Sequence, residues 1–156
     1  MGGGAERNVY DRLRTVRRAV RPIEAAQTRR LGRSLLSLAF RTPVLVLHTT
    51  GRRSGRERTT TLAYHEDADG SLLVVGGAGG QSRIPDWVSN LRASPRAAVT
   101  LDRQRFDVVG TEIAGHERQS IWPQLAAVWP QIDAYERRAR RPVPVFRLTR
   151  TESAAS

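Results

Sequence analysis

Residues 44–64 read VLVLHTTGRRSGRERTTTLAY, and this stretch decides the fold. It begins with a continuous apolar run at Val44–Leu47 and ends with a β-branched run from Thr59 to Tyr64. Between the two runs, residues 49–58 hold four arginines and two glycines. Short apolar and β-branched runs on either side of a glycine-containing connection are typical of neighbouring β-strands. The stretch therefore predicts two strands joined by a strongly basic loop.

Further strands are expected on the C-terminal side of this pair. Residues 72–75 follow the turn at residues 67–70 and should complete a three-stranded meander. A hairpin around Asp102-Arg103 joins residues 97–101 to residues 105–113, and the last strand is expected at residues 143–148.

Helices are expected outside these strands. One short helix begins at Pro85-Asp86 and ends at Ser94-Pro95, and two more occupy roughly residues 117–128 and 131–140. Helices confined to the ends and to one insertion favour an α+β fold over a doubly wound sheet. We therefore predict a β-barrel of about six mostly antiparallel strands, spanning residues 41–150.

Residues 1–40 are expected to form a separate, basic helical segment. Val9, Leu13, Val16 and Val20 recur at helical spacing among several arginines, which predicts a basic amphipathic helix. Its apolar face either packs on the barrel or lies on an anionic membrane surface, and the sequence leaves both open. Residues 151–156 are expected to form a disordered tail.

Composition restricts the class of protein. The chain has 156 residues, 39% apolar and 26% charged, which suits one folded domain. We find neither a run long enough to span a membrane nor the apolar core of a signal peptide, so a cytoplasmic location is expected, with peripheral membrane contact as the second interpretation. With no cysteine and three scattered histidines, a metal site is not expected, and an organic cofactor would have to supply any redox chemistry.

The basic loop is a candidate anion site. Gly51 and Gly55 permit positive φ and a close backbone approach, so backbone N–H groups can surround an anion together with Arg52, Arg53 and Arg58. The net charge of +11 likewise indicates an anionic partner. The competing interpretation is a solvated turn in an arginine-rich chain.

A second candidate is the glycine run at residues 76–80. It follows an apolar strand and precedes the helix that carries Trp87 and Asn90. Neither the phosphate-binding loop GxxxxGK[ST] nor the dinucleotide fingerprint GxGxxG is present. Trp87 could equally be a core residue.

In combination these motifs resemble a known family. They are TTGRRSG at residues 49–55 with Arg58, Thr59 and Leu62, then Val74-Val75 with Gly79-Gly80, then PxWxxNLxAxP at residues 85–95. Over about residues 40–148 the chain is similar to the deazaflavin (F420)-dependent nitroreductases and F420H2-dependent quinone reductases. The resemblance implies a split β-barrel related to the flavin-binding barrels of the pyridoxamine-phosphate-oxidase type.

The resemblance also implies a cofactor site and an acceptor site. The arginines would bind the phosphate and anionic tail of F420, and other positions would lie along the deazaflavin and its linker. These implied cofactor residues are Arg52, Arg53, Arg58, Thr60, Thr61, Val75, Gly76, Trp87 and Asn90. Where family members often carry a lysine, this chain has Ala78, and Arg83 could replace that charge. The acceptor site would hold Trp129, Ile132 and Tyr135, of which only Tyr135 keeps the family's phenol.

The expected function is hydride transfer from F420H2 to a small organic acceptor, a quinone, enone or nitro compound. Tyr135 is the candidate proton donor. One alternative keeps the barrel and replaces F420 with FMN; another is a cofactor carrier without turnover. A basic nucleic-acid-binding domain is the rival from a different class, but the arginines do not line one helix and no aromatic RNA-binding motif is present, so no nucleic-acid partner is expected. Monomer and homodimer both stay open.

Overall fold

The structure is a computed structural model that describes residues 42–77 and 82–152. The predicted N-terminal segment, residues 78–80 of the glycine run and residues 153–156 of the predicted tail lie outside the described residues. Among the described residues, no helix has the length and apolar character needed to cross a membrane.

The expected strands and helices of residues 42–152 are present, with ends that differ by a few residues. One two-residue strand, His65–Glu66, was not predicted. In chain order the elements are β1 (Val44–Thr50), β2 (Glu57–Ala63), β3 (His65–Glu66), β4 (Leu72–Val75), α3 (Asp86–Ala93), β5 (Arg96–Leu101), β6 (Gln104–Glu112), α4 (Gly115–Val128), α5 (Ile132–Ala139) and β7 (Val145–Arg150).

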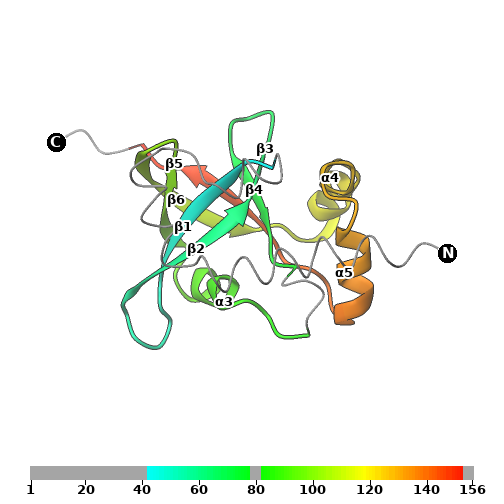
Figure 1. Ribbon diagram of the computed structural model, residues 1–156, viewed down its shortest axis with the longest axis horizontal. Helices are drawn as coiled ribbons and strands as arrows, with labels where there is room; N and C mark the ends of the chain where they lie inside the picture. The colour runs from blue at the N-terminus through cyan, green and yellow to red at the C-terminus, as the bar shows by residue number, and fades with distance from the viewer. Residues whose placement is uncertain (1–41, 78–81, 153–156) are drawn as a thin grey trace.

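All strand pairs are antiparallel, in the order β2-β1-β5-β6-β7-β4-β3. The two edge strands, β2 and β3, are consecutive in the chain and separated only by Tyr64. The sheet must therefore curl until its edges meet, and Figure 1 shows the resulting open barrel. The predicted split barrel is confirmed. The predicted meander is wrong in one respect, because β4 pairs with β7 and β3 and not with β2.

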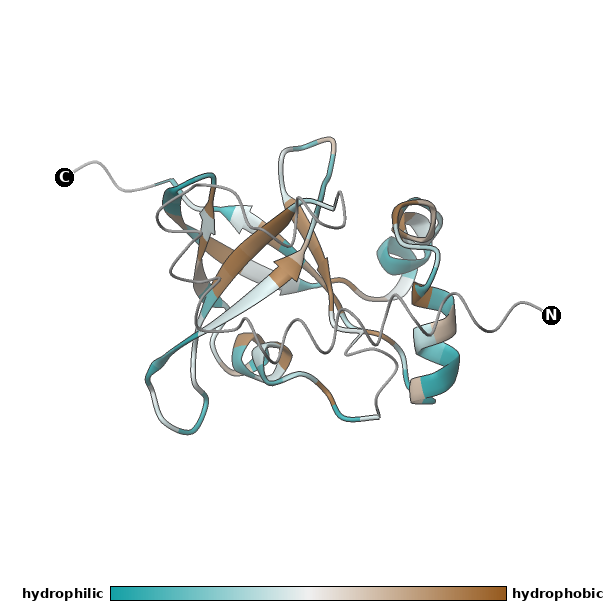
Figure 2. Ribbon diagram, in the orientation of Figure 1, coloured by the Kyte–Doolittle hydropathy of each residue, from teal (hydrophilic) through white to brown (hydrophobic). Residues whose placement is uncertain are grey.

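The inner face of the barrel carries the main core. Strict alternation along each strand sends every second side chain inward. One buried cluster joins these inward side chains to the apolar face of α3: Leu45, Leu47, Leu62, Leu72, Val74, Trp87, Val88, Leu91, Val99, Val108, Phe146 and Leu148. The brown strands at the centre of Figure 2 follow this core. Since α3 contributes to the same cluster, it is fixed rigidly against the barrel.

A second core lies on the outer face of β4 and β7. Leu73 and Val145 point away from the barrel interior and pack beneath α4 and α5. The helices contribute Ile121, Leu125, Trp129 and Ile132 to this cluster. In Figure 1, α4 and α5 accordingly lie together on one side of the barrel. The outer face is thus helix-covered over this half of the sheet.

Candidate functional site

Asn90 joins the basic loop to α3. Its side chain is 3% exposed. The Oδ1 atom accepts a hydrogen bond of 3.0 Å from the backbone N–H of Arg52, and the Nδ2 group donates one of 3.2 Å to Thr49 Oγ1. Burial of the apolar face of α3 brings this amide to the end of β1, where the basic loop begins. The predicted loop and the predicted helix are therefore in direct contact.

The basic loop is closed by its own backbone. Gly51 N–H donates to Arg56 O at 2.7 Å, and Gly55 N–H donates to Gly51 O at 2.8 Å. Gly55 has φ +68°, which is the positive φ that the sequence analysis expected a glycine here to permit. Gly51 serves the close approach instead, because a Cβ atom there would come within 2.6 Å of Ser54 Oγ. A side chain at Gly51 would displace the Ser54 hydroxyl and press on Arg56 O at 3.2 Å, and one at Gly55 would be strained by the positive φ.

The arginine side chains of this loop differ in their partners. Arg52 forms an ion pair of 3.6 Å with Asp86, and Arg83 forms one of 3.1 Å with the same carboxylate. Arg53 and Arg58 are exposed, and no carboxylate within residues 42–77 and 82–152 pairs with either of them. An excess of positive charge therefore remains at the loop.

Asp86 titrates below its usual range because of these arginines. Desolvation acts to raise the pKa of this carboxyl. The hydrogen bond from Arg83 and the charges of Arg83 and Arg52 outweigh it and lower the pKa. Asp86 thus stays ionised at neutral pH and holds the two guanidinium groups near the first turn of α3.

Strand register decides which β2 residues face α3. Arg58 lies opposite Thr49, and Thr60 lies opposite Leu47, so both point to the inner side of the sheet. Thr61 is adjacent to Thr60 in an extended strand and points to the outer side. Arg58 and Thr60 therefore point to the side of the sheet on which α3 packs, and Thr61 points to the opposite side.

The described start of the glycine run continues the site along α3. Gly76 follows Val75, the half-buried last residue of β4, and its N–H donates to Pro144 O at 2.7 Å. A Cβ atom on Gly76 would come within 2.9 Å of Val88 Cγ2 in α3. A Cβ atom on Gly77 would come within 2.8 Å of Tyr135 Cδ2. Successive contacts thus link the basic loop, α3, the buried Gly76 and Gly77, and α5, and we call this group of elements the α3 site.

Trp87 lies in the core beneath this site. Trp87 is 4% exposed, and its ring packs edge-on against Phe146 with the ring centroids 5.6 Å apart. The structure shows the indole anchoring α3, a role that the sequence offered as the alternative. Contact between Trp87 and a cofactor stays a prediction.

The three predicted acceptor residues do not share one environment. Trp129 and Ile132 are 7% and 2% exposed and belong to the second core cluster, against which Val75 also packs. The Trp129 indole N–H has no hydrogen-bond partner in the part of the chain that the structure describes. Tyr135 is half-buried and is the member of the three that contacts the glycine run.

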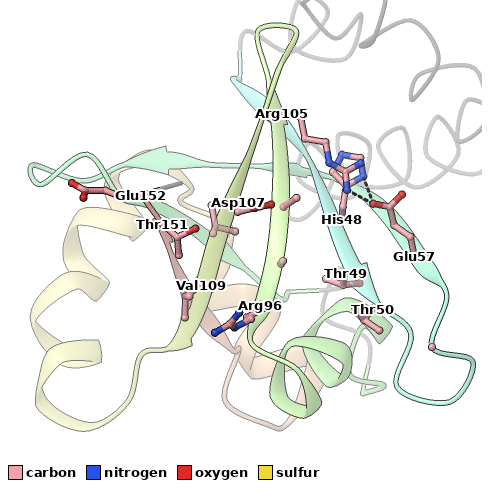
Figure 3. A pocket seen from close by; sticks show the side chains of 14 residues that line it. His48, Thr49, Thr50, Glu57, Arg96, Arg105, Asp107, Val109, Thr151 and Glu152 are labelled. Atoms are coloured by element: carbon pink, nitrogen blue, oxygen red, sulfur yellow. Dashed lines mark hydrogen bonds and ion pairs between the residues drawn. The ribbon is translucent and has the colours of Figure 1, made fainter. Parts of the chain in front are cut away.

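A polar cavity on the outer face was not predicted. It has a volume of about 720 Å³ and is lined by residues of β1, β5 and β6, by Gly55 and Glu57, and by Thr151 and Glu152 (Figure 3). His48, 4% exposed, reaches Thr100 Oγ1 at 2.8 Å and Glu57 at 3.4 Å at its edge. None of the predicted site residues lines it. The sequence signal for it is weak, because these polar side chains are distant in the chain and meet only through strand register.

Comparison with known proteins gives a consistent set of relatives. The family model described as F420H(2)-dependent quinone reductase matches residues 14–150. A Mycobacterium tuberculosis H37Rv protein named F420H(2)-dependent quinone reductase is 35% identical over 116 residues, covering 69% of this chain and 74% of its own length. A solved F420-H2 dependent reductase superposes with TM-score 0.60 at 28% identity, over 68% of this chain and 93% of its own. A solved structure described as a domain-swapped dimer has TM-score 0.61 at 28% identity, over 68% and 79% of the two chains.

Proposed function

Because the chain belongs to the F420H(2)-dependent quinone reductase family, we propose that it transfers hydride from reduced F420 to a quinone, an enone or a nitro-type acceptor. The observation that carries this proposal is the pair of hydrogen bonds that join Asn90 to Arg52 and Thr49 of the basic loop. They hold a cationic loop against α3, and Gly76 at the start of the glycine run meets the same helix. An elongated ligand with an anionic tail can therefore contact all three elements at once.

The basic loop suits the tail of F420, which carries a phosphodiester and several carboxylates. Arg53 and Arg58 are exposed and have no carboxylate partner among residues 42–77 and 82–152, so their guanidinium groups can bind these anions bidentately. The guanidinium group of Arg52 would bind the same anions once its ion pair with Asp86 is broken. The N–H of Arg52 is already used by Asn90, so its side chain is the part that would bind.

The ring of the cofactor would lie along the α3 site. Gly76 and Gly77 are buried, and a side chain at either position would collide with Val88 or Tyr135, so the glycines let β4 and its following loop pack closely on α3 and α5. Thr60 and Val75 are half-buried at the two sides. In this proposal Trp87 and Asn90 act mainly by holding α3 in place. Thr61 points to the outer side of β2, so it would contact the linker of the cofactor only where that linker passes over the edge of β2.

F420H2 supplies hydride from a ring carbon when it is bound, and the protein supplies position and a proton. A quinone that accepts one hydride needs one proton to become a hydroquinone. Tyr135 is the proposed donor, because its ring packs on Gly77 at the end of the glycine run. Trp129 and Ile132 would form the apolar wall behind Val75. That wall favours a flat, apolar acceptor.

The alternatives differ in the support they have. The matching family and the reported mycobacterial relative are named for F420H2, so the FMN alternative receives no support from them. A carrier that binds F420 without turnover is distinguished by testing for acceptor reduction. Oligomeric state and cytoplasmic location stay predictions, and the domain-swapped dimer among the similar structures makes a homodimer worth testing.

A binding titration tests the proposed cofactor. The protein is titrated with F420, with the same deazaflavin lacking phosphate and tail, and with FMN. We expect F420 to bind at least about 10-fold more tightly than the tail-less compound, because each charge-assisted hydrogen bond contributes on the order of 1.5–3 kcal/mol. Added salt should reduce that advantage. Tighter binding of FMN, or equal binding of both deazaflavins, contradicts the proposal.

A further inference from the structure

Arg52 is held at two points by residues that lie one turn apart on α3. Its backbone N–H donates to Asn90 Oδ1 at 3.0 Å, and its guanidinium group lies 3.6 Å from the carboxylate of Asp86. Residues four apart share one face of a helix, so the face that binds the loop backbone through Asn90 also presents Asp86 to the Arg52 side chain. The ion pair therefore follows from the way the basic loop docks on α3.

The carboxylate of Asp86 has a second arginine partner. Arg83 Nη2 donates to both of its oxygens, at 3.1 and 3.3 Å. The backbone before α3 is itself tied to the region after α5, because Arg141 donates to Ser82 O at 3.0 Å and to Arg83 O at 3.1 Å. Asp86 thus occupies an arginine of the basic loop and an arginine of the segment before α3 at the same time.

Both ion pairs of Asp86 can exchange with a ligand. The side chains of Asp86, Arg52 and Arg83 are 63%, 32% and 77% exposed, so water and ions reach these contacts. Ion pairs at such exposed positions contribute little to folding stability. The contact between Arg52 and Asp86, at 3.6 Å, is also longer than a direct hydrogen bond. A phosphate or carboxylate group of a ligand can therefore replace Asp86 on both guanidinium groups.

We propose that Asp86 is an internal competitor for the anionic tail of the cofactor and keeps the cofactor exchangeable, an inference that rests on the proposed function. The tail meets Arg53 and Arg58 first, because no carboxylate of residues 42–77 and 82–152 pairs with either of them. Arg52 and Arg83 then pass from Asp86 to the tail within the complex. When these contacts break, Asp86 recaptures the guanidinium groups and promotes release.

Exchange of the cofactor matters for the proposed reaction because F420H2 delivers a single hydride. After transfer to the acceptor, the oxidised cofactor has to leave before the next F420H2 can bind. Without a competing carboxylate, the arginines around the α3 site would hold the tail longer, since charge-assisted hydrogen bonds are among the strong ones. Asp86 therefore lowers the affinity for the tail and raises the rate of release.

Asp86→Asn removes the competing charge and keeps the shape of the side chain. Its affinity for tripolyphosphate, a probe of the arginines that requires no F420, is measured by isothermal titration calorimetry on the full chain. We expect the Kd to fall about fivefold relative to the natural protein, the effect of losing an exposed ion pair. Glu112→Gln is the matched control, because Glu112 pairs with Arg92 in the last turn of α3, away from the basic loop. Its Kd should change less than about twofold.

A gain in affinity separates competition from a structural role. Asp86 also lies in the first turn of α3, where a carboxylate stabilises the positive end of a helix. If that is its only role, D86N should lower the Tm and leave the Kd for tripolyphosphate unchanged or higher. An equal fall of the Kd in D86N and E112Q would instead reflect net charge. Either result overturns the proposal.

The release rate of F420 gives the readout closest to function. In stopped-flow dilution, D86N should release F420 about fivefold more slowly than the natural protein, while the association rate changes less than about twofold. A long-range attraction would instead raise the association rate and leave release unchanged, which contradicts the proposal. Tighter tripolyphosphate binding by D86N without any binding of F420 would support the competition and refute the proposed function. Turnover of F420H2 with the natural Kd and release rate in D86N would do the reverse.

Discussion

The side-chain oxygen of Asn90 accepts the backbone N–H of Arg52 at 3.0 Å, across 38 residues of sequence. This bond connects the helix inserted between β4 and β5 to the loop between β1 and β2. The amide is 3% exposed, so water cannot readily replace its partners. The position of the cationic loop relative to the glycine run therefore depends on one buried side chain.

Replacing Asn90 with leucine should loosen the basic loop. The change leaves the N–H of Arg52 and the hydroxyl of Thr49 without their partner, at a cost of about 1–3 kcal/mol in unfolding free energy. We expect the Kd for F420 to rise at least about 10-fold, because the arginines lose their orientation. Thr49→Val is the control that removes one bond only, and its effect should be smaller. Equal F420 affinity in N90L and the natural protein would show that Asn90 does not contribute to cofactor binding.

The exposed arginines of the loop should determine affinity for the anionic tail. Arg58→Gln and Arg53→Gln should each raise the Kd for F420 about 10-fold or more and leave binding of the tail-less deazaflavin unchanged. Arg103→Gln removes the same charge from the exposed turn between β5 and β6 and should have little effect. If all three variants weaken F420 equally, the attraction is a property of net charge and not of this loop.

The contact between Gly77 and Tyr135 should control the proposed proton donor. Gly77→Ala places a methyl group about where the tyrosine ring lies, 2.8 Å from Cδ2, so the ring must move. We expect both G77A and Y135F to lower kcat for quinone reduction while F420 affinity changes less, an effect on the order of 10²-fold for lost proton donation. In the double variant G77A/Y135F the losses should not add. Unchanged kcat in Y135F for every acceptor tested removes the phenol from the mechanism.

Arg147 links the β3–β4 turn to β7 and should give a pH-dependent contribution to stability. The hydrogen bond from Arg147 to Asp67, 2.7 Å long, lowers the pKa of that carboxyl, with a second contribution from the N–H of Ala68. A depressed carboxyl pKa stabilises the fold above the unfolded value near 4, and this stability is lost as pH falls through the folded pKa.

Asp67→Asn should therefore reduce the unfolding free energy by about 1–2 kcal/mol at pH 7, and the difference from the natural protein should shrink below about pH 4. Urea unfolding at pH 7 and pH 3.5 measures both quantities. Asp102→Asn, at an exposed turn, is the control and should change neither. A difference that stays constant with pH would show that the carboxyl charge is not what stabilises this turn.

Local sequence patterns were sufficient for most of the fold. Runs such as residues 44–47 and 72–75 have the length and composition of strands, and Pro85 marks the start of α3. The bend at Tyr64 was not predictable, because a one-residue break in a β-branched run carries no turn signal. That break moves β3 to the opposite edge of the sheet and is why the meander was wrong.

The site was predictable as a set of residues but not as an arrangement. Thr60 and Thr61 are equivalent in a motif, yet strand alternation sends them to opposite faces. Trp87 could form either a core or a ligand wall at the same helical position, and only tertiary packing against Phe146 decides that it is buried. The partnership between Asn90 and Arg52 likewise needed three dimensions, because nothing local joins the two residues.

Anaerobic mixing of the full chain with F420H2 and a panel of quinones, enones and nitro compounds tests the central claim most directly. We predict that at least one acceptor oxidises F420H2 in equal molar amount, at a rate proportional to protein concentration, and that R58Q raises KM for F420H2 while largely retaining kcat. Bound F420H2 that stays reduced with every acceptor, or equal turnover with reduced FMN in its place, would contradict the account.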